Sequence, residues 1–369
     1  MAVATDLLVA GGGIIGCAVA LEAARNGLRV VLAEPAVIGG GATGAAMGHL
    51  VILDDDPVEL ALCRLSLALW QDLLDEPGVE HAATGTLWIA ATAEEAELAR
   101  AKLQRLRDAG VAAEWLDERA LAEAEPLLRP GRVGAVRVPG DAVVYPPGAA
   151  RQLWARAERL GARRIHAGVQ ALTSGGATLD DGTEVSSAAV VLACGLRTIA
   201  LAPALPVVPR KGHLVVTDRY PRLVQHQLIE LGYMASAHAH DGGDSVAMNV
   251  QPRPTGQLVI GSSRQFTADE AIDLAIVRTM LERAFAYMPG LRRLQALRVW
   301  AGFRPASRDG RPFIGPYPGH PQVWLATGHE GLGITTSLGT ARLVVDQILG
   351  QPSAIDPAPY APSRMMSCA

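Results

Sequence analysis

The stretch VAGGGIIGCAVALEAARNGLRVVLAE, Val9–Glu34, decides the fold of the first part of this chain. Its pattern predicts a buried strand at residues 7–10, an Ala- and Leu-rich helix at residues 14–26 and a second buried strand at residues 28–34. A glycine-rich loop separates the first strand from the helix, and a further glycine ends the helix. We therefore expect one strand–helix–strand unit, which is the context of a dinucleotide-binding loop.

The loop carries its glycines in the pattern GxGxxG, at Gly11, Gly13 and Gly16. Gly11 permits the tight turn, Gly13 lets the backbone approach a pyrophosphate, and Gly16 lets the helix pack closely on the strand. The helix N-terminus offers free N–H groups and a positive dipole end to phosphates. Glu34 lies 18 residues after Gly16, near the ~20 expected of an acid that binds ribose hydroxyls. These features favour a dinucleotide site over an ordinary glycine-rich turn.

The segment IGGGATGAAMGHL, residues 38–50, bears on whether the dinucleotide is NAD or FAD. It consists largely of Gly and Ala, with Thr43 in the middle, so its backbone can run beside a large planar ligand. A nicotinamide enzyme does not need such a segment directly after its ribose acid, whereas a flavin must be buried and held along its length. We therefore expect FAD; the alternative is a loop of small residues packed against a helix.

Composition excludes several classes of protein. The chain has 369 residues, 49% of them hydrophobic and 19% charged, which predicts a globular protein of two domains. Its net charge of -4 gives no basic excess for nucleic acid. The four cysteines are scattered, which argues against an iron–sulfur or zinc site and favours a reducing, cytoplasmic compartment. We expect no metal site, no signal peptide and no membrane span.

The rest of the chain predicts a mixed α/β fold with an α+β substrate layer. EWLDERALAEAEPLLR, residues 114–129, has the pattern of a short helix, and strand-like runs after Lys211 predict an antiparallel sheet with helices on one side. We expect a discontinuous, Rossmann-like cofactor domain and a separate antiparallel-sheet substrate domain. The predicted bounds are 1–80, 143–205 and 297–369 for the first domain, and 81–142 and 206–296 for the second.

Seven segments, in this order, resemble the flavin amine oxidoreductase family of D-amino acid oxidase, glycine oxidase and sarcosine oxidase. They are the N-terminal unit, GGGATGAAMGHL, VVLACG, PRKGHLVVT, GQLVIGSS, RVWAGFRPASRDGRPFIG and TGHEGLGITTSLG. The resemblance covers almost the whole chain. Within the family, MGHLVILDD, GTLW, PGDAVVYPP and NVQPRPTGQLVIGSSRQF are most similar to the flavin (beta) subunits of bacterial D-hydroxyproline dehydrogenases. The cyanide-forming glycine dehydrogenase subunit is the next most similar.

The resemblance implies that FAD is held along the first domain. It also implies another helix N-terminus near Gly331–Thr335, whose positive dipole end would stabilise the negative charge of reduced flavin. Relatives that tether flavin carry a cysteine in the segment matching DGRPFIGPYP, and this chain has none there, so we expect non-covalent FAD. The implied cofactor residues are Gly11, Gly13, Ile14, Ile15, Gly16, Glu34, Pro35, Ala42, Thr43, Met47, Gly48, His49, Leu50, Val169, Ala193, Gly195, Gly331, Leu332, Gly333, Ile334 and Thr335.

The resemblance also implies a carboxylate-binding residue, Arg304 in WAGFRP. A bidentate guanidinium–carboxylate pair would orient the substrate carbon toward flavin N5. The alternative is that Arg304 is one of several arginines in an exposed turn. Glycine oxidase has a tyrosine before its GxLVxG strand to help grip the carboxylate. Asn249 stands at the matching place here, and either Asn249 or Tyr233 is expected to replace it.

His49 is the acid/base candidate among the histidines, because its segment is expected to face the flavin. His238 and His240 are expected to be loop or core histidines. A base is not required by this chemistry, since a neutral amine can lose hydride directly when binding supplies the geometry.

The activity implied is FAD-dependent oxidation of a D-amino or imino acid to the imine or pyrroline, by hydride transfer to flavin N5. The substrate implied is cis-4-hydroxy-D-proline. The resemblance further implies electron-accepting partner subunits. Two alternatives stay open: a glycine or sarcosine oxidase that uses oxygen, and an electron-relay flavin subunit that never meets a substrate.

Overall fold

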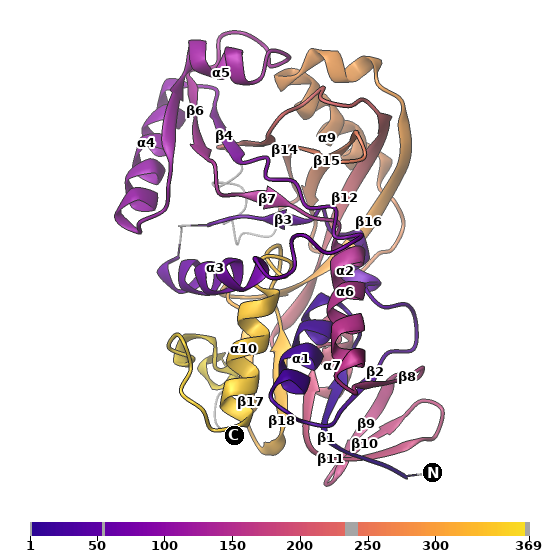
Figure 1. Cartoon of the computed structure of the whole chain (residues 1–369). Helices are drawn as coiled ribbons and strands as arrows, with labels where there is room; N and C mark the ends of the chain where they lie inside the picture. The colour runs from indigo at the N-terminus through magenta and orange to yellow at the C-terminus, as the bar shows by residue number, and fades with distance from the viewer. Residues whose placement is uncertain (1, 54–55, 233–242, 366–369) are drawn as a thin grey trace.

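The computed structural model describes residues 2–53, 56–232 and 243–365. It contains two eight-stranded sheets and a two-stranded sheet of β3 (His49–Leu50) and β7 (Ala142–Val143). Figure 1 shows the two large sheets as two layers, with β1, β2, β11 and β18 in the lower layer and β4, β14 and β15 in the upper one. The mixed α/β class expected from the sequence is confirmed.

The first sheet is built around parallel strands. Its order is β17-β18-β11-β1-β2-β8, and β10 and β9 continue from β11. β1 pairs in parallel with both β2 and β11, and β11 pairs in parallel with β18. The strand bounds are β1 Ala2–Ala10, β2 Val30–Ala33, β8 Arg163–Ile165, β9 Val169–Thr173, β10 Gly176–Leu179, β11 Glu184–Leu192, β17 Phe313–Tyr317 and β18 His320–Thr327.

Helices pack on this sheet because its central strands are apolar on both faces. Leu7, Leu8 and Val9 of β1 are fully buried. α1 (Ile14–Arg25) packs against both α6 (Pro146–Arg159) and α10 (Ser337–Ile348). The chain leaves β1, β11 and β18 at the same edge of the sheet, where ligands of open α/β sheets bind.

The second sheet is antiparallel except where β13 meets β4. Its order is β16-β12-β15-β14-β13-β4-β6-β5. α9 (Leu274–Tyr287) packs against β14 and β15, and α4 (Ala93–Asp108) packs against β4 and β6. The strand bounds are β4 Thr86–Ala90, β5 Glu114–Asp117, β6 Gly134–Val138, β12 Val207–Arg219, β13 Gln227–Glu230, β14 Ser245–Pro252, β15 Gln257–Arg264 and β16 Ala296–Ser307.

The remaining elements are short or join the two layers. Aspartate and threonine side chains cap several of the helices: Asp56 begins α3, Thr92 begins α4 and Asp273 begins α9. Among the described residues, no helix combines the length and the apolar character needed to cross a membrane. The other bounds are α2 Gly41–Ala45, α3 Pro57–Trp70, α5 Glu118–Ala124, α7 Thr198–Leu201, η1 Gly195–Arg197, η2 Pro289–Arg293, η3 Ala358–Tyr360 and η4 Pro362–Met365.

Three local expectations differ from the structure. Residues 114–117 form the edge strand β5 rather than the start of a helix, because they pair with β6. α10 begins at Ser337, after a series of turns, so residues 331–335 precede the helix rather than forming its first turn. β16 pairs with β12 in the second sheet, although the predicted bounds group it with the cofactor domain. The division into two domains stays a proposal.

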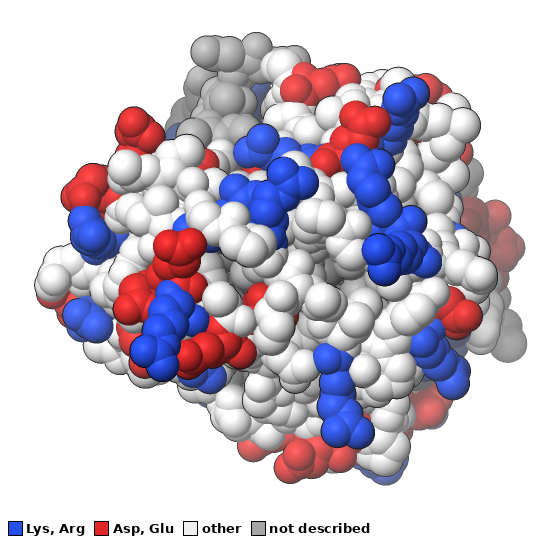
Figure 2. All heavy atoms as spheres, turned by 90° about the horizontal axis from the view of Figure 1, so that it is seen from above, with Lys and Arg blue, Asp and Glu red and all other residues white. Residues whose placement is uncertain are grey.

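Surface charge is mixed. Figure 2 shows basic and acidic side chains interspersed with larger uncharged areas on the face seen from above. This face therefore does not present a continuous basic surface of the kind that binds nucleic acid.

Candidate functional site

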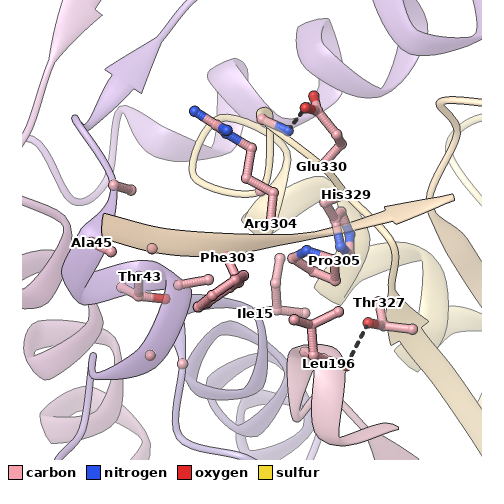
Figure 3. Close-up of a pocket in the computed structure, with 18 of the residues that line it drawn as sticks. Ile15, Thr43, Ala45, Leu196, Phe303, Arg304, Pro305, Thr327, His329 and Glu330 are labelled. Atoms are coloured by element: carbon pink, nitrogen blue, oxygen red, sulfur yellow. Dashed lines mark hydrogen bonds between the residues drawn. The ribbon is translucent and has the colours of Figure 1, made fainter. Parts of the chain in front are cut away.

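A large cavity lies where the edge of the first sheet meets the second sheet. Its volume is about 1290 Å³, above the ~300–1,000 Å³ typical of sites for drug-sized ligands. The glycine-rich loop, the segment 40–49 and the chain after β11 line one part, and β16 and its neighbours line another. Figure 3 shows β16 crossing this region, with Ile15, Thr43 and Leu196 nearby.

The glycine-rich loop is packed so closely that side chains would not fit. Gly11 has φ +103°, and a Cβ there would lie 2.7 Å from the carbonyl oxygen of Ala193. A Cβ on Gly16 would overlap the carbonyl oxygen of Gly11. Gly13 caps α1 with extended backbone, and a Cβ there would lie 3.3 Å from Thr43 Oγ1. The loop thus brings bare backbone against the cavity at the N-terminus of a helix, as phosphate binding requires.

Glu34 stands at the end of β2 in the cavity wall. Its Oε2 accepts a hydrogen bond from Gly12 N at 2.7 Å, and its Oε1 accepts one from Ala36 N at 2.8 Å. Val169 lines the same part of the cavity. The two amide contacts fix the carboxylate in position, and each oxygen retains a lone pair for a ribose hydroxyl.

Hydrogen bonds hold segment 38–50 to the start of α1, to the turns before α10 and to the second sheet. Thr43 Oγ1 accepts from Ile14 N at 3.0 Å, and Thr335 Oγ1 donates to the carbonyl oxygen of His49 at 2.9 Å. On the other side, Gln251 Nε2 donates to the carbonyl oxygen of Met47 at 2.9 Å. These bonds replace the side-chain packing that a Gly/Ala-rich segment lacks, and they leave its backbone facing the cavity.

These observations match the demands of FAD. The glycines would hold the pyrophosphate, Glu34 the ribose next to the adenine, and segment 42–49 the ring system. Glu34 and Arg304 line the same cavity, whose volume is large enough for an elongated cofactor and a small substrate.

Arg304 lies on β16 in the cavity wall rather than in an exposed turn. Its Nη1 donates to the carbonyl oxygen of Ser263 at 3.2 Å. Its guanidinium rests against Gly212 of β12, where a Cβ would lie 2.7 Å from Cζ. The missing side chain at residue 212 therefore provides the space that Arg304 occupies.

Glu330 is an acidic residue among arginines in the same wall. Its Oε1 lies 3.3 Å from Arg264 Nε and 3.4 Å from Arg210 Nη1. Burial alone would raise the pKa of the Glu330 carboxyl, but the charges of Arg264, Arg304 and Arg210 outweigh it and hold this pKa at about 2. Glu330 is therefore ionised at neutral pH.

His49 lies in the wall with its Nε2 buried, and among the described residues no group bonds that atom. Burial, and to a smaller extent the charge of Arg304, lowers the pKa of His49 to about 4. The imidazole is therefore neutral at neutral pH. A group with so low a pKa is a weak general base, which fits chemistry that needs none.

Asn249 also lies in the wall, and it is 4% exposed. Its Oδ1 bonds to none of the described residues. Tyr233, the alternative partner for a carboxylate, lies outside the described residues, as do His238 and His240. Of this pair, Asn249 is the residue that the structure describes, and its position in the wall is compatible with the expected role.

Most of the predicted cofactor residues line the cavity, and three do not. Gly16 lies behind Gly11, Leu50 is buried beneath the segment, and Thr335 acts through the backbone of His49 and Val51. Among the described residues, no group of three or more His, Cys, Asp or Glu side chains could hold a metal. The roles of the individual residues stay predictions.

Sequence reasoning missed many wall residues, among them the large or charged side chains of Trp88, Arg210, Arg264, Phe303 and Glu330. All of these but Glu330 lie on strands of the second sheet. Figure 3 shows Arg304 and Glu330 extending to the same side of β16 and Phe303 to the other. Side chains alternate between the two faces of a strand, so the sequence could have suggested which residues of β12, β15 and β16 point to the same face. It could not have shown that these three strands are neighbours.

Comparison with known proteins agrees with this geometry. The model of the DAO family, FAD dependent oxidoreductase, matches residues 6–347. Glycine oxidase from Pseudomonas aeruginosa is 31% identical over 97% of this chain and 98% of its own length. The crystal structure of glycine oxidase from Geobacillus kaustophilus has a TM-score of 0.86 at 29% identity, covering 98% of this chain and 99% of that one.

A more distant structure shares the fold. L-proline dehydrogenase from P. horikoshii, 23% identical, has a TM-score of 0.87 over 99% of this chain and 98% of its own. The family match extends over almost the whole chain, including the glycine-rich loop, Glu34 and Arg304. The chain therefore belongs to the DAO family of FAD-dependent oxidoreductases, uses FAD as its cofactor and is an enzyme that acts on amine donors.

Proposed function

We propose that this enzyme oxidises a small D-amino or imino acid at its α-carbon, with Arg304 binding the substrate carboxylate. The observation that supports this proposal is that Arg304 lines the same cavity as the dinucleotide loop. Its guanidinium packs against Gly212 and donates a hydrogen bond to the carbonyl oxygen of Ser263. FAD, when bound, supplies the acceptor for the two electrons that leave the C–N unit. The substrate loses two hydrogens in all and becomes an imine, or a pyrroline if it is a proline ring.

Within this class we propose cis-4-hydroxy-D-proline as the substrate. Trp88, Ile229 and Asn249 occupy directly opposite positions on β4, β13 and β14, so their side chains share one face of the sheet. All three line the cavity. The aromatic and aliphatic side chains suit the carbons of a ring. The Asn249 amide has both donors and an acceptor, so it offers a hydrogen bond to a ring hydroxyl as well as one to the carboxylate.

The protein's own contribution to the reaction is positioning. Arg304 would fix the carboxylate, and the apolar wall would exclude water from the amine, which must lose its extra proton before oxidation. His49 is neutral and close enough to Arg304 to feel its charge, so it adds no second cation beside the amine.

An anaerobic screen tests this proposal. The FAD-bound protein is mixed with D- and L-forms of proline, 4-hydroxyproline and alanine, and with glycine and sarcosine, and the loss of the yellow flavin absorbance is followed. We expect fastest bleaching by cis-4-hydroxy-D-proline. If L-amino acids bleach the flavin and no D-amino acid does, the proposed stereochemistry is wrong.

Glycine or sarcosine is the second candidate substrate. The observation that favours it is that relatives 28–31% identical over almost their full length carry the name glycine oxidase. The same screen separates the candidates, because a glycine oxidase bleaches with glycine and uses oxygen directly. A flavin that stays oxidised with every amino acid would instead indicate an electron-relay subunit.

A further inference from the structure

Four charged side chains meet in the part of the cavity that the mechanism uses for one carboxylate. Arg210 and Arg304 stand directly opposite each other on β12 and β16. Arg264 ends β15, the strand on the other side of β12. Glu330 reaches this group from the turn after β18, and all four residues line the cavity.

Glu330 is held firmly in its place. Its backbone N–H donates to the carbonyl oxygen of Pro305 at 3.0 Å, and its φ of +46° lies in the left-handed region that glycine favours. Its Oε2 accepts from Gly331 N at 2.6 Å. A non-glycine residue keeps such a backbone only when its surroundings fix it, and such positions cluster at ligand sites.

The Glu330 carboxylate has the position that an anionic ligand would take. Its Oε1 contacts both Arg210 and Arg264, and its side chain is only 17% exposed. Arg264 is 7% and Arg210 is 11% exposed, so these ion pairs are poorly screened by water. Arg304, which would bind the substrate carboxylate, is close enough for its charge to lower the pKa of Glu330.

We propose that Glu330 determines specificity by filling a second anion position between Arg210 and Arg264, so that the site accepts amino acids with one carboxylate and rejects those with two. This proposal rests on the proposed function, in which Arg304 binds the first carboxylate. A second carboxylate meets a fixed negative charge and two arginines already engaged by it. Like-charge contacts of this kind are a common means of rejecting a wrong ligand.

The inference predicts a gain of binding when the charge is removed. Glu330→Gln keeps the size and the hydrogen-bonding oxygen but leaves Arg210 and Arg264 without their fixed carboxylate. A dicarboxylate then binds Arg304 with one end and these arginines with the other. Glu330→Asp is the matched control, because it keeps the negative charge.

The test measures dissociation constants of acetate and malonate from the change in flavin absorbance of the FAD-bound protein. We expect the wild type to bind malonate at least about tenfold more weakly than acetate. The ratio of the malonate to the acetate dissociation constant should fall by about tenfold or more in Glu330→Gln. In Glu330→Asp this ratio should change by less than about threefold. Bleaching by D-aspartate relative to D-alanine should change in the same direction.

Two results would overturn the inference. The first is a wild type that binds malonate as well as acetate, which needs no variant to fold. The second is a Glu330→Gln protein in which both ligands weaken equally, since this indicates a structural role or a contact with the substrate amine. A wild-type flavin that responds to no carboxylate and no amino acid would instead refute the proposed function itself.

Discussion

The guanidinium of Arg304 occupies the space that a side chain on Gly212 would fill. A Cβ at residue 212 would lie 2.5 Å from Nη2 and 2.7 Å from Cζ. Gly212 also lies opposite Gly302 in the pairing of β12 with β16. Neither residue has a side chain, and this leaves space on the sheet for the guanidinium of Arg304. The orientation of Arg304 is thus determined by a glycine in the neighbouring strand.

Gly212→Ala should therefore displace Arg304 while leaving FAD bound. Since small misplacements of a positioning group cost up to about a hundredfold, we expect kcat/KM to fall roughly tenfold to a hundredfold. FAD content and kinetics are measured together. Gly140→Ala is the control, because nothing lies within 4 Å of a Cβ there. Wild-type kinetics in Gly212→Ala would show that Arg304 tolerates the displacement.

Arg304→Leu should damage substrate capture far more than FAD content. Removing one side of a buried charged pair costs roughly 3–5 kcal/mol, which predicts a fall in kcat/KM of about 10²–10³ or more. Arg298→Leu, an exposed residue on the same strand, should stay within about twofold of the wild type. If Arg304→Leu keeps near-normal kcat/KM for every substrate of the wild type, Arg304 does not bind the substrate carboxylate.

Glu34→Lys should weaken FAD retention. The change leaves the N–H groups of Gly12 and Ala36 without their acceptor and removes the expected ribose contact. We expect the dissociation constant of FAD to rise roughly tenfold to a hundredfold. Glu158→Lys, at an exposed position of α6, is the matched control.

FAD content is measured after acid precipitation. Because the segment DGRPFIGPYP has no cysteine, all yellow colour should appear in the supernatant. A yellow pellet would show a covalent bond, and the retention assay would then say nothing about Glu34.

The buried carboxyl of Asp141 should make stability fall as the pH rises. Burial raises the pKa of Asp141 to about 7, above its ordinary value of 3.8. Between these values the folded state binds more protons than the unfolded state, so this group's stabilisation is complete below pH ~3.8 and is lost as the pH rises through about 7. Asp141→Asn keeps the acceptor for Ile52 N and removes the titration.

Melting temperatures of Asp141→Asn and the wild type check this. We expect the melting temperature of the variant, relative to that of the wild type, to be at least about 2 °C higher at pH 8 than at pH 5. Asp180→Asn, an exposed carboxyl, controls for net charge. A difference between Asp141→Asn and the wild type that does not change with pH would contradict the expected titration.

The reduced protein should react slowly with oxygen and quickly with an artificial quinone dye. This follows from the proposed role as a dehydrogenase with electron-accepting partner subunits. The sequence has one dinucleotide loop and scattered cysteines, a pattern that favours a partner for the next electron transfer. The protein is reduced anaerobically with a good substrate and then mixed with each acceptor. Reoxidation by oxygen at the turnover rate, with stoichiometric hydrogen peroxide, would show that the protein is an oxidase and would contradict the proposal of electron-accepting partner subunits.

The sequence predicted well those parts of the site that are close together along the chain. The loop from Gly11 to Gly16 and the acid Glu34 belong to one local unit, whose spacing is dictated by helix and strand geometry. The arginine cluster was different, because Arg210, Arg264 and Arg304 come from three segments joined only by strand pairing. The local pattern of apolar and polar residues does not reveal which distant strands pair. The proximity of these three arginines therefore could not be predicted from one sequence.

Local ambiguity explains the smaller errors. Residues 114–117 have no clear period, and their strand conformation depends on hydrogen bonds to β6. α10 begins later than the sequence predicts because residues 334–336 are Ile and Thr, whose β-branched side chains disfavour a helix. Thr336 is the cap residue in the structure.

The pairing of β1 with β11 also bears on how the enzyme is made. Val9 lies beside Val191, and the cavity wall is completed only by residues 331–334. More than 300 residues must therefore be synthesised after the phosphate loop before that loop acquires its opposite wall. FAD can be fully enclosed only after residues 331–334 have folded against the loop, so the two ends of one binding site are formed at widely separated times during synthesis.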